Sequence, residues 1–142
     1  MRLRAVKKPF SGKTLREYSA PWLEARMDDL TRDILHIIET SCFTCGLTKE
    51  LQVGHLFERR HRHTRWDVHE KGNNHLQCPN CNYKHEEKPE KYQDMYKRRF
   101  GEEAYAELDA RAHSRMKIEY IDLFEKWEQM KAQLRQLQGK AA

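Results

Sequence analysis

The sequence contains little apolar material. Hydrophobic residues make up 38% of its 142 positions and charged residues 35%, and the mean hydropathy is -1.02. It lacks the run of roughly 18 to 20 apolar residues that a membrane span needs, and no apolar stretch follows its basic start. We therefore expect a soluble protein that is neither inserted nor secreted. With so few apolar residues, some link other than burial should help to stabilise its compact part.

The four cysteines are the candidates for that link. They form two Cys-x-x-Cys pairs, Cys42 with Cys45 and Cys78 with Cys81, separated by 32 residues. In a reducing cytoplasm such pairs bind metal more often than they form disulfides, and four thiolates match the tetrahedral preference of zinc. A thioredoxin-type redox motif would need alternating strands and helices, which are absent. Because four thiolates leave no open position for water, we predict one structural zinc per chain.

The net charge of +5 is unevenly distributed. Residues 1–18 carry six Lys or Arg against one acid, which indicates a basic flexible arm that either contacts a polyanion or serves as a solvated tail. Residues 58–65 carry four arginines and one glutamate. Because guanidinium groups suit phosphate oxygens, we favour DNA backbone binding by this segment over a solvated hairpin tip. Its arginines are Arg59, Arg60, Arg62 and Arg65.

Apolar periodicity predicts helices on both sides of the cysteine-rich segment. Residues 19–39 form an N-terminal helix with Ser19 as its cap and Pro21 in its first turn, and the chain returns to helix after Pro89 with a break at Gly101. The fold class is therefore α+β and mostly helical. We divide the chain into the arm (1–18), the N-terminal helix (19–39), a small zinc-bound module (40–100) and C-terminal helices (101–138).

The last helical stretch carries a heptad seam. Seven apolar residues follow one another at spacings of four and three: Met116, Tyr120, Leu123, Trp127, Met130, Leu134 and Leu137. This regularity favours a homodimer through the C-terminal helix. An intrachain bundle with residues 21–39 stays an alternative, because Tyr120 and Trp127 are bulky for a two-stranded coil.

The segment between the cysteine pairs has the order of a ββα-metal nuclease. A strand ends at His55, a second strand carries Asn74, and a helix opens with the metal ligand Cys78. In such a site a neutral imidazole activates water, a divalent cation bridges the scissile phosphate and the leaving oxygen, and an amide orients the imidazole. The plainer interpretations are a half-buried histidine for His55, a turn residue for Asn74 and a helix cap for Asn82.

The ordered motifs Cys-x-x-Cys, Gly-His, Arg-Trp-Asp and Asn-x-x-x-Cys-x-x-Cys-Asn resemble the phage NinG (Rap) recombination nucleases over about residues 40–110. These are HNH proteins similar to the endonuclease VII class of Holliday junction resolvases. The resemblance implies a phage-encoded, dimeric enzyme in the cytoplasm of a bacterial host. It implies cleavage of branched DNA, such as Holliday junctions and D-loops, with Mg²⁺ or Mn²⁺. His55 would be the general base, Asn74 the central Asn of the motif and Asn82 a metal ligand.

One position departs from many HNH sites, which place Asp before the catalytic His where this chain has Gly54. The divalent ion would then lack an anionic ligand, for which Asp67 is the first candidate and His85 the second. Two other functions remain open. One is an HNH nicking nuclease without branch preference, and the other is a non-catalytic zinc-knuckle protein that binds DNA during recombination.

Overall fold

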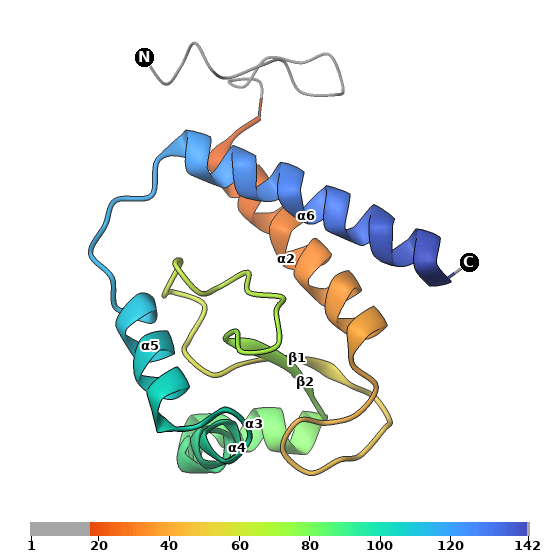
Figure 1. Cartoon of the computed structure of the whole chain (residues 1–142), viewed down its shortest axis with the longest axis vertical. Helices are drawn as coiled ribbons and strands as arrows, with labels where there is room; N and C mark the ends of the chain where they lie inside the picture. The colour runs from red at the N-terminus through yellow and green to blue at the C-terminus, as the bar shows by residue number, and fades with distance from the viewer. Residues whose placement is uncertain (1–17, 142) are drawn as a thin grey trace. The chain divides into compact units, whose positions relative to one another are not determined.

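The computed structural model describes residues 18–141, so the predicted basic arm lies outside the described residues except for Tyr18. Within that range the chain forms five helices and one two-stranded sheet, which confirms the mostly helical α+β class (Figure 1). In order these are α2 (Ala20–Ile38), β1 (Gln52–His55), β2 (Asn74–Gln77), α3 (Pro79–Glu87), α4 (Glu90–Phe100), α5 (Glu102–Ala112) and α6 (Tyr120–Ala141). None of the described helices has the length and apolar character to cross a membrane.

The described chain divides into two compact units. The terminal unit contains residues 18–30 and 116–141, and the central unit contains residues 31–115. Helix α2 begins in the first and ends in the second, and its start agrees with the predicted signals. The backbone N–H of Trp22 donates to Oγ of Ser19 at 3.2 Å, so Ser19 caps the helix, and Pro21 stands in the first turn.

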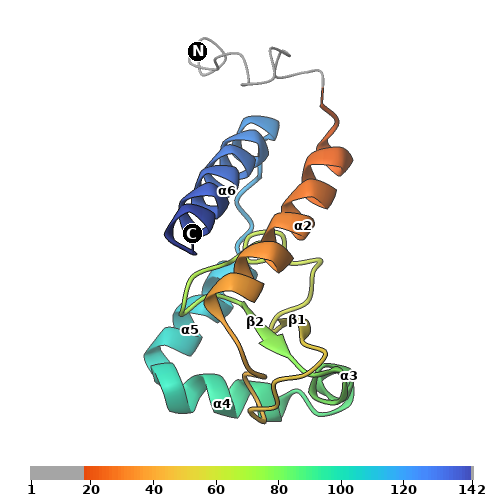
Figure 2. The same cartoon turned by 90° about the vertical axis from the view of Figure 1, so that its right-hand side faces the viewer.

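An aromatic cluster joins the two helical segments of the terminal unit. The ring of Trp127 on α6 lies 5.1 Å from that of Tyr18 and 5.6 Å from that of Trp22, while Phe124 lies 5.6 Å from Trp127. The ammonium group of Lys131 lies 3.5 Å from the centre of the Trp127 ring, where it gains a cation–π attraction. Figure 2 shows α2 and α6 as two unbroken helices.

The helix that carries the predicted heptad seam begins at Tyr120, so the first seam residue, Met116, is not part of it. Met116 lies in the preceding non-helical segment and is 77% exposed. The central seam residues are buried within the single chain: Leu123, Trp127 and Met130. The ring contacts of Trp127 fit the intrachain alternative, and a dimer through this helix stays a prediction.

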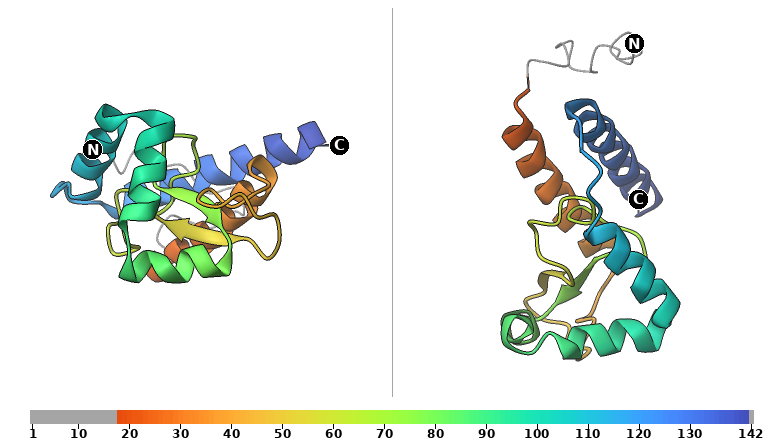
Figure 3. Two further views of the ribbon diagram at one scale, coloured as in Figure 1. Left: turned by 90° about the horizontal axis from the view of Figure 1, so that it is seen from below. Right: turned by 90° about the vertical axis from the view of Figure 1, so that its left-hand side faces the viewer.

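The central unit is built around an antiparallel hairpin. Strands β1 and β2 pair in the register Gln52 with Gln77 and His55 with Asn74. Helix α3 packs against both strands, and α4 contacts α3 and α5 (Figure 3). One cluster of the unit's core contains five buried side chains: Phe43, Leu56, Tyr92, Tyr96 and Leu108. Other apolar side chains of this unit, such as Trp66 and Leu76, are also buried. Two tyrosines also bind the hairpin backbone, since Tyr92 donates its hydroxyl to O of Gly54 at 2.9 Å and Tyr96 donates to O of Lys71 at 2.6 Å.

Helix boundaries in this unit follow local chemistry. Cys78 is the N-cap of α3 and Pro79 its first residue, a position where the missing N–H of proline costs nothing. Helices α4 and α5 meet at Gly101, whose φ of 95° is accessible to glycine without strain. The predicted helix break at Gly101 is therefore confirmed.

Candidate metal centre and nuclease-like site

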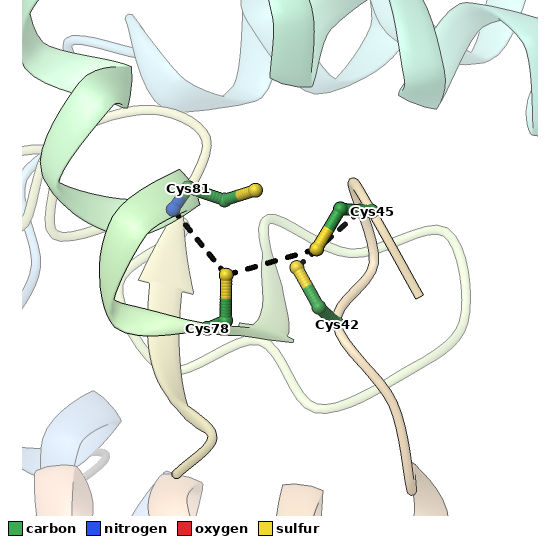
Figure 4. A group of neighbouring side chains, drawn as sticks. All are labelled: Cys42, Cys45, Cys78 and Cys81. Carbon is green, nitrogen blue, oxygen red and sulfur yellow. Dashed lines mark hydrogen bonds between the residues drawn. The ribbon is translucent and has the colours of Figure 1, made fainter. Parts of the chain in front are cut away.

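The four cysteines come together from two places in the chain. Cys42 and Cys45 lie in the loop after α2, and Cys78 and Cys81 lie at the start of α3 (Figure 4). Their sulfur atoms all lie within 4.8 Å of one another, and Sγ of Cys45 is 3.7 Å from Sγ of Cys78. A tetrahedron with Zn–S bonds of about 2.3 Å has edges of about 3.8 Å, so the sulfur set fits a zinc ion.

Each pair is shaped by a hydrogen bond from its own backbone. The N–H of Cys45 points at Sγ of Cys42, and the N–H of Cys81 points at Sγ of Cys78, both at 3.4 Å. These bonds favour a negative sulfur, as a metal-bound thiolate requires. The spacing of two residues therefore bends each pair into a knuckle whose two sulfurs face one point.

The thiol pKa values differ within the cluster. Burial would raise the pKa of Cys42, but the backbone N–H groups of Cys78, Cys45 and Thr44 outweigh it and lower the pKa to about 7. Burial and the neighbouring thiols of Cys78 and Cys45 raise the pKa of Cys81. At Cys45, desolvation and the neighbouring sulfurs outweigh the N–H of Leu47 and raise the pKa. A divalent cation supplies the charge that allows all four to be thiolates.

The hairpin places His55 and Asn74 opposite each other. His55 is the last residue of β1, is half-buried, and pairs directly with Asn74 on β2, so both side chains lie on one face of the sheet. Asn74 is fully buried, and its amide donates to O of Arg65 at 2.8 Å and O of Asp67 at 3.0 Å. These bonds give Asn74 a function that sequence reasoning missed, which is to hold the hairpin loop (residues 56–73) against the strands.

Asp67 is held by an ion pair. Both of its carboxylate oxygens accept hydrogen bonds from the guanidinium of Arg111 on α5, at 2.9 and 2.7 Å, and Oδ2 also accepts from N of Asn73 at 2.8 Å. The Asp67 side chain is 5% exposed. This bidentate pair raises the pKa of Arg111 through the Asp67 hydrogen bonds. Asp67 therefore fixes the hairpin loop to α5, and its charge is neutralised rather than available to a cation.

The other two expected cation ligands contact β1 from α3. Nδ2 of Asn82 donates to Oε1 of Gln52 at 2.6 Å, at the opposite end of β1 from His55. Nε2 of His85 lies 3.0 Å from O of Leu56. Because a carbonyl only accepts, this nitrogen carries the proton in the neutral ring.

The residues expected to bind a second, catalytic cation are thus not gathered around His55. Within residues 18–141 the cysteine cluster is the one group of three or more His, Cys, Asp or Glu side chains arranged to hold a metal ion. The described side chains therefore fit a zinc at the knuckles and do not by themselves form a Mg²⁺ or Mn²⁺ site.

Gly54 is explained by the side chain opposite it. A Cβ at this position would lie 2.0 Å from Oε1 of Gln77, which is 1% exposed and is tied to Thr44 by a hydrogen bond of 2.8 Å from its Nε2. The space that an aspartate at position 54 would need is taken by Gln77. The absence of the expected carboxylate is therefore a packing feature of this hairpin.

We expect Gly54→Ala to destabilise the protein by about 1–3 kcal/mol, because the added methyl must displace a buried, hydrogen-bonded side chain. Thermal unfolding followed by circular dichroism would measure the effect. Gly139→Ala on α6 is the control, since a Cβ there meets nothing within 4 Å and no loss is expected. Equal melting temperatures for the two variants would contradict the packing explanation.

The predicted phosphate-binding arginines all lie in the hairpin loop, which contains no strand or helix. Arg59 and Arg60 are exposed, whereas Arg62 and Arg65 are half-buried. Arg60 pairs with Glu58 at 2.9 Å, and the guanidinium of Arg65 lies 5.1 Å from the centre of the Trp66 ring. Phosphate binding by this loop stays a prediction.

Sequence reasoning also missed a hydrogen bond between Glu39, which follows α2, and His75 on β2. Oε2 of Glu39 lies 2.7 Å from Nδ1 of His75, and Oε1 accepts from N of Leu76 at 2.7 Å. His75 stacks on Phe43, with ring centres 4.1 Å apart, and the guanidinium of Arg99 lies 4.1 Å from the Phe43 ring centre. No local pattern links residues 36 positions apart, so these partners emerge only from the fold.

Comparison with known proteins identifies a family. A family model described as bacteriophage lambda NinG protein matches residues 13–140, nearly the whole chain. No curated protein and no solved structure matches the chain.

Proposed function

Because the chain belongs to the family of the bacteriophage lambda NinG protein, a phage recombination-related family, we propose that it is an HNH endonuclease that cuts branched DNA. The substrates would be four-way junctions and D-loops formed during phage recombination. The nearest alternatives are a nicking nuclease without branch preference and a zinc-knuckle protein that binds DNA without cutting it.

The observation that carries the proposal is the placement of His55. It ends β1, faces Asn74 across the hairpin, and lies in a unit whose next helix starts at the cysteine cluster. The knuckles join the loop before β1 to the start of α3, which follows β2, so a bound zinc would hold the hairpin and its helix as one rigid body. Rigid support of a single imidazole is what general-base chemistry requires.

In the proposed reaction a ring nitrogen of neutral His55 takes a proton from a water molecule as its oxygen attacks phosphorus. One P–O bond forms to the water oxygen and the scissile P–O bond breaks, and the leaving oxygen gains a proton from solvent. Asn74 acts indirectly, because it fixes the loop backbone at Arg65 and Asp67 beside the strand that carries His55. His55 is thus the proposed catalytic residue and Asn74 a positioning residue.

We keep Mg²⁺ or Mn²⁺ as the proposed cofactor of cleavage. When bound, such an ion neutralises charge on the phosphate and the leaving oxygen. Asn82 stays its proposed protein ligand, with DNA phosphates completing the set, while Asp67 is paired with Arg111 and Nε2 of His85 donates to O of Leu56.

Cleavage of a labelled four-way junction and of a matched linear duplex tests the proposal, with Mg²⁺, with Mn²⁺ and with no added divalent ion. We expect the wild type to cut the junction preferentially, and His55→Ala to lose at least about 100-fold in rate while keeping its affinity for the junction. His36→Ala is the matched control, because His36 is exposed on α2 in the same unit. Its rate should equal that of the wild type.

The possible results separate the three functions. Equal cleavage of junction and duplex would support the nicking nuclease, and the branch preference would be wrong. A wild type that binds both substrates but cuts neither with either ion would support the non-catalytic protein. Undiminished cleavage by His55→Ala would exclude His55 as the general base.

A further inference from the structure

A cation-lined pocket lies between α3, α4 and the first cysteine knuckle, away from the hairpin loop. Its volume is about 380 Å³, within the range of small-ligand sites. The lining includes Lys84 and Lys88 from α3 and its C-cap, and Lys91 and Arg98 from α4. Asp94 is the one acidic residue of the lining. Cys45 and Cys81 of the cysteine cluster also line the pocket, and the charged side chains other than these two cysteines sum to a net positive charge of three.

The four cations of the pocket are exposed, and no ion pair neutralises any of them within residues 18–141. Elsewhere in the same unit, arginines and lysines do find partners, as Arg111 does at Asp67 and Lys97 at Glu102. Four unpaired cations around one concavity repel one another unless an anion enters. The charge pattern therefore favours an anionic ligand.

The pocket lining also holds two buried polar atoms that lack a hydrogen-bond partner among the described residues. They are Oε1 of Gln77 and Nδ1 of His85. Because Nε2 of His85 is the proton donor to Leu56, Nδ1 is an acceptor in the neutral ring, and an amide oxygen is always an acceptor. Buried acceptors without a partner cost free energy, so a ligand with N–H donors would be favoured here.

We infer that this pocket binds one unpaired nucleotide of a DNA strand. Its phosphate would lie against Lys84, Lys88 and Lys91, and the N–H groups of its base edge would meet His85 and Gln77. A phosphate and N–H donors occur together in a nucleotide, and the base edge is free only where the strand is unpaired. The inference rests on the proposed action on DNA and supplies a structural basis for recognition of branched substrates that carry unpaired bases, such as the displaced strand of a D-loop.

Binding measured without cleavage tests the cationic rim. The rim variant is Lys84→Gln/Lys88→Gln/Lys91→Gln, and the control Lys49→Gln/Lys117→Gln/Lys140→Gln removes the same charge from exposed lysines outside the pocket. A fluorescent single-stranded oligonucleotide is titrated over a range of salt, with no Mg²⁺ or Mn²⁺. For the rim variant we expect affinity to fall on the order of tenfold and the slope of log K against log salt to flatten by about 2. Equal losses in the two variants, or no loss in the rim variant, would overturn the inference.

Nuclear magnetic resonance tests the base contacts in the wild-type protein. Both inorganic phosphate and deoxyadenosine monophosphate should shift the backbone signals of Lys84, Lys88 and Lys91. Only the nucleotide should also shift the side-chain amide of Gln77 and the ring of His85. Shifts centred on the hairpin loop, or identical shifts with both probes, would contradict a nucleotide pocket.

These results are independent of the cleavage assay. If the wild type cuts no DNA but the rim variant loses binding, the pocket is supported and the endonuclease is not. If the wild type cuts junctions while the rim variant binds the oligonucleotide as well as the control does, the pocket inference fails and the endonuclease stands.

Discussion

Removal of the zinc, or the change Cys78→Ser, is expected to unfold the central unit. Cys78 is both a predicted ligand and the N-cap of α3, so its loss opens the tetrahedral set and the start of the helix together. Structural zinc contributes apparent free energies of about 10–16 kcal/mol in small metal-dependent modules, while whole domains are stable by about 5–15 kcal/mol. The apolar core of the central unit is small, so burial alone does not offset such a loss.

Metal analysis and far-ultraviolet circular dichroism measure this effect. Dialysed wild type should retain one zinc per chain and lose helical signal on treatment with a strong chelator or on acidification, because protons compete for the thiolates. Asn80→Ser is the matched control, since Asn80 is exposed between Cys78 and Cys81 and offers no thiolate. It should bind zinc and melt like the wild type. A Cys78→Ser protein that is metal-free yet melts unchanged would show that the cluster is not structural.

Arg111→Leu is expected to cost about 2–4 kcal/mol of stability and to release the hairpin loop. The substitution leaves the Asp67 carboxylate buried without its partner, which is the expensive way to break an ion pair. The expected loss of stability is smaller than for a fully buried ion pair, because the Arg111 side chain is itself 40% exposed. Arg111→Lys, which keeps the charge but loses the bidentate geometry, should fall between the wild type and Arg111→Leu.

Urea unfolding followed by tryptophan fluorescence reports on this loop when Trp22 and Trp127 are replaced by Phe in all variants compared, because the remaining indole, Trp66, is buried beside Asp67. The midpoint should fall with an unchanged slope if the two-state transition is kept. Arg115→Leu is the control, as an exposed arginine close by in the chain. A change below about 0.5 kcal/mol for Arg111→Leu, the size of an ordinary surface substitution, would mean that the pair does not stabilise the loop.

The parts of the fold that the sequence predicts are those encoded by local patterns. The two Cys-x-x-Cys spacings predict the sulfur cluster, Ser19 and Pro21 mark the start of α2, and Gly101 marks a helix break. Each of these signals involves residues a few positions apart, where backbone geometry alone decides the outcome.

The contacts of the candidate site residues could not be predicted locally, because they join distant positions of the chain. Asp67 was expected to bind a cation, but Arg111, 44 positions later, neutralises it. Asn82 was expected near His55 but contacts Gln52 at the other end of β1. Nothing in the local sequence reveals such partners. The pocket lysines also gave no single local signal, because Lys84 and Lys88 belong to α3 and its C-cap while Lys91 belongs to α4.

The conformation of the hairpin loop depends mainly on hydrogen bonds to its main chain. Hydrogen bonds from outside the loop reach main-chain carbonyls at His63, Arg65, Asp67 and Lys71, and the side chains of Asp67 and Asn73 also join this anchoring network. Main-chain carbonyls are the same whatever residue carries them. Exposed positions such as Arg59 and Arg60 can therefore mutate without loss of the loop conformation. Point substitutions at such positions can therefore change the surface of the loop while its main-chain scaffold is kept.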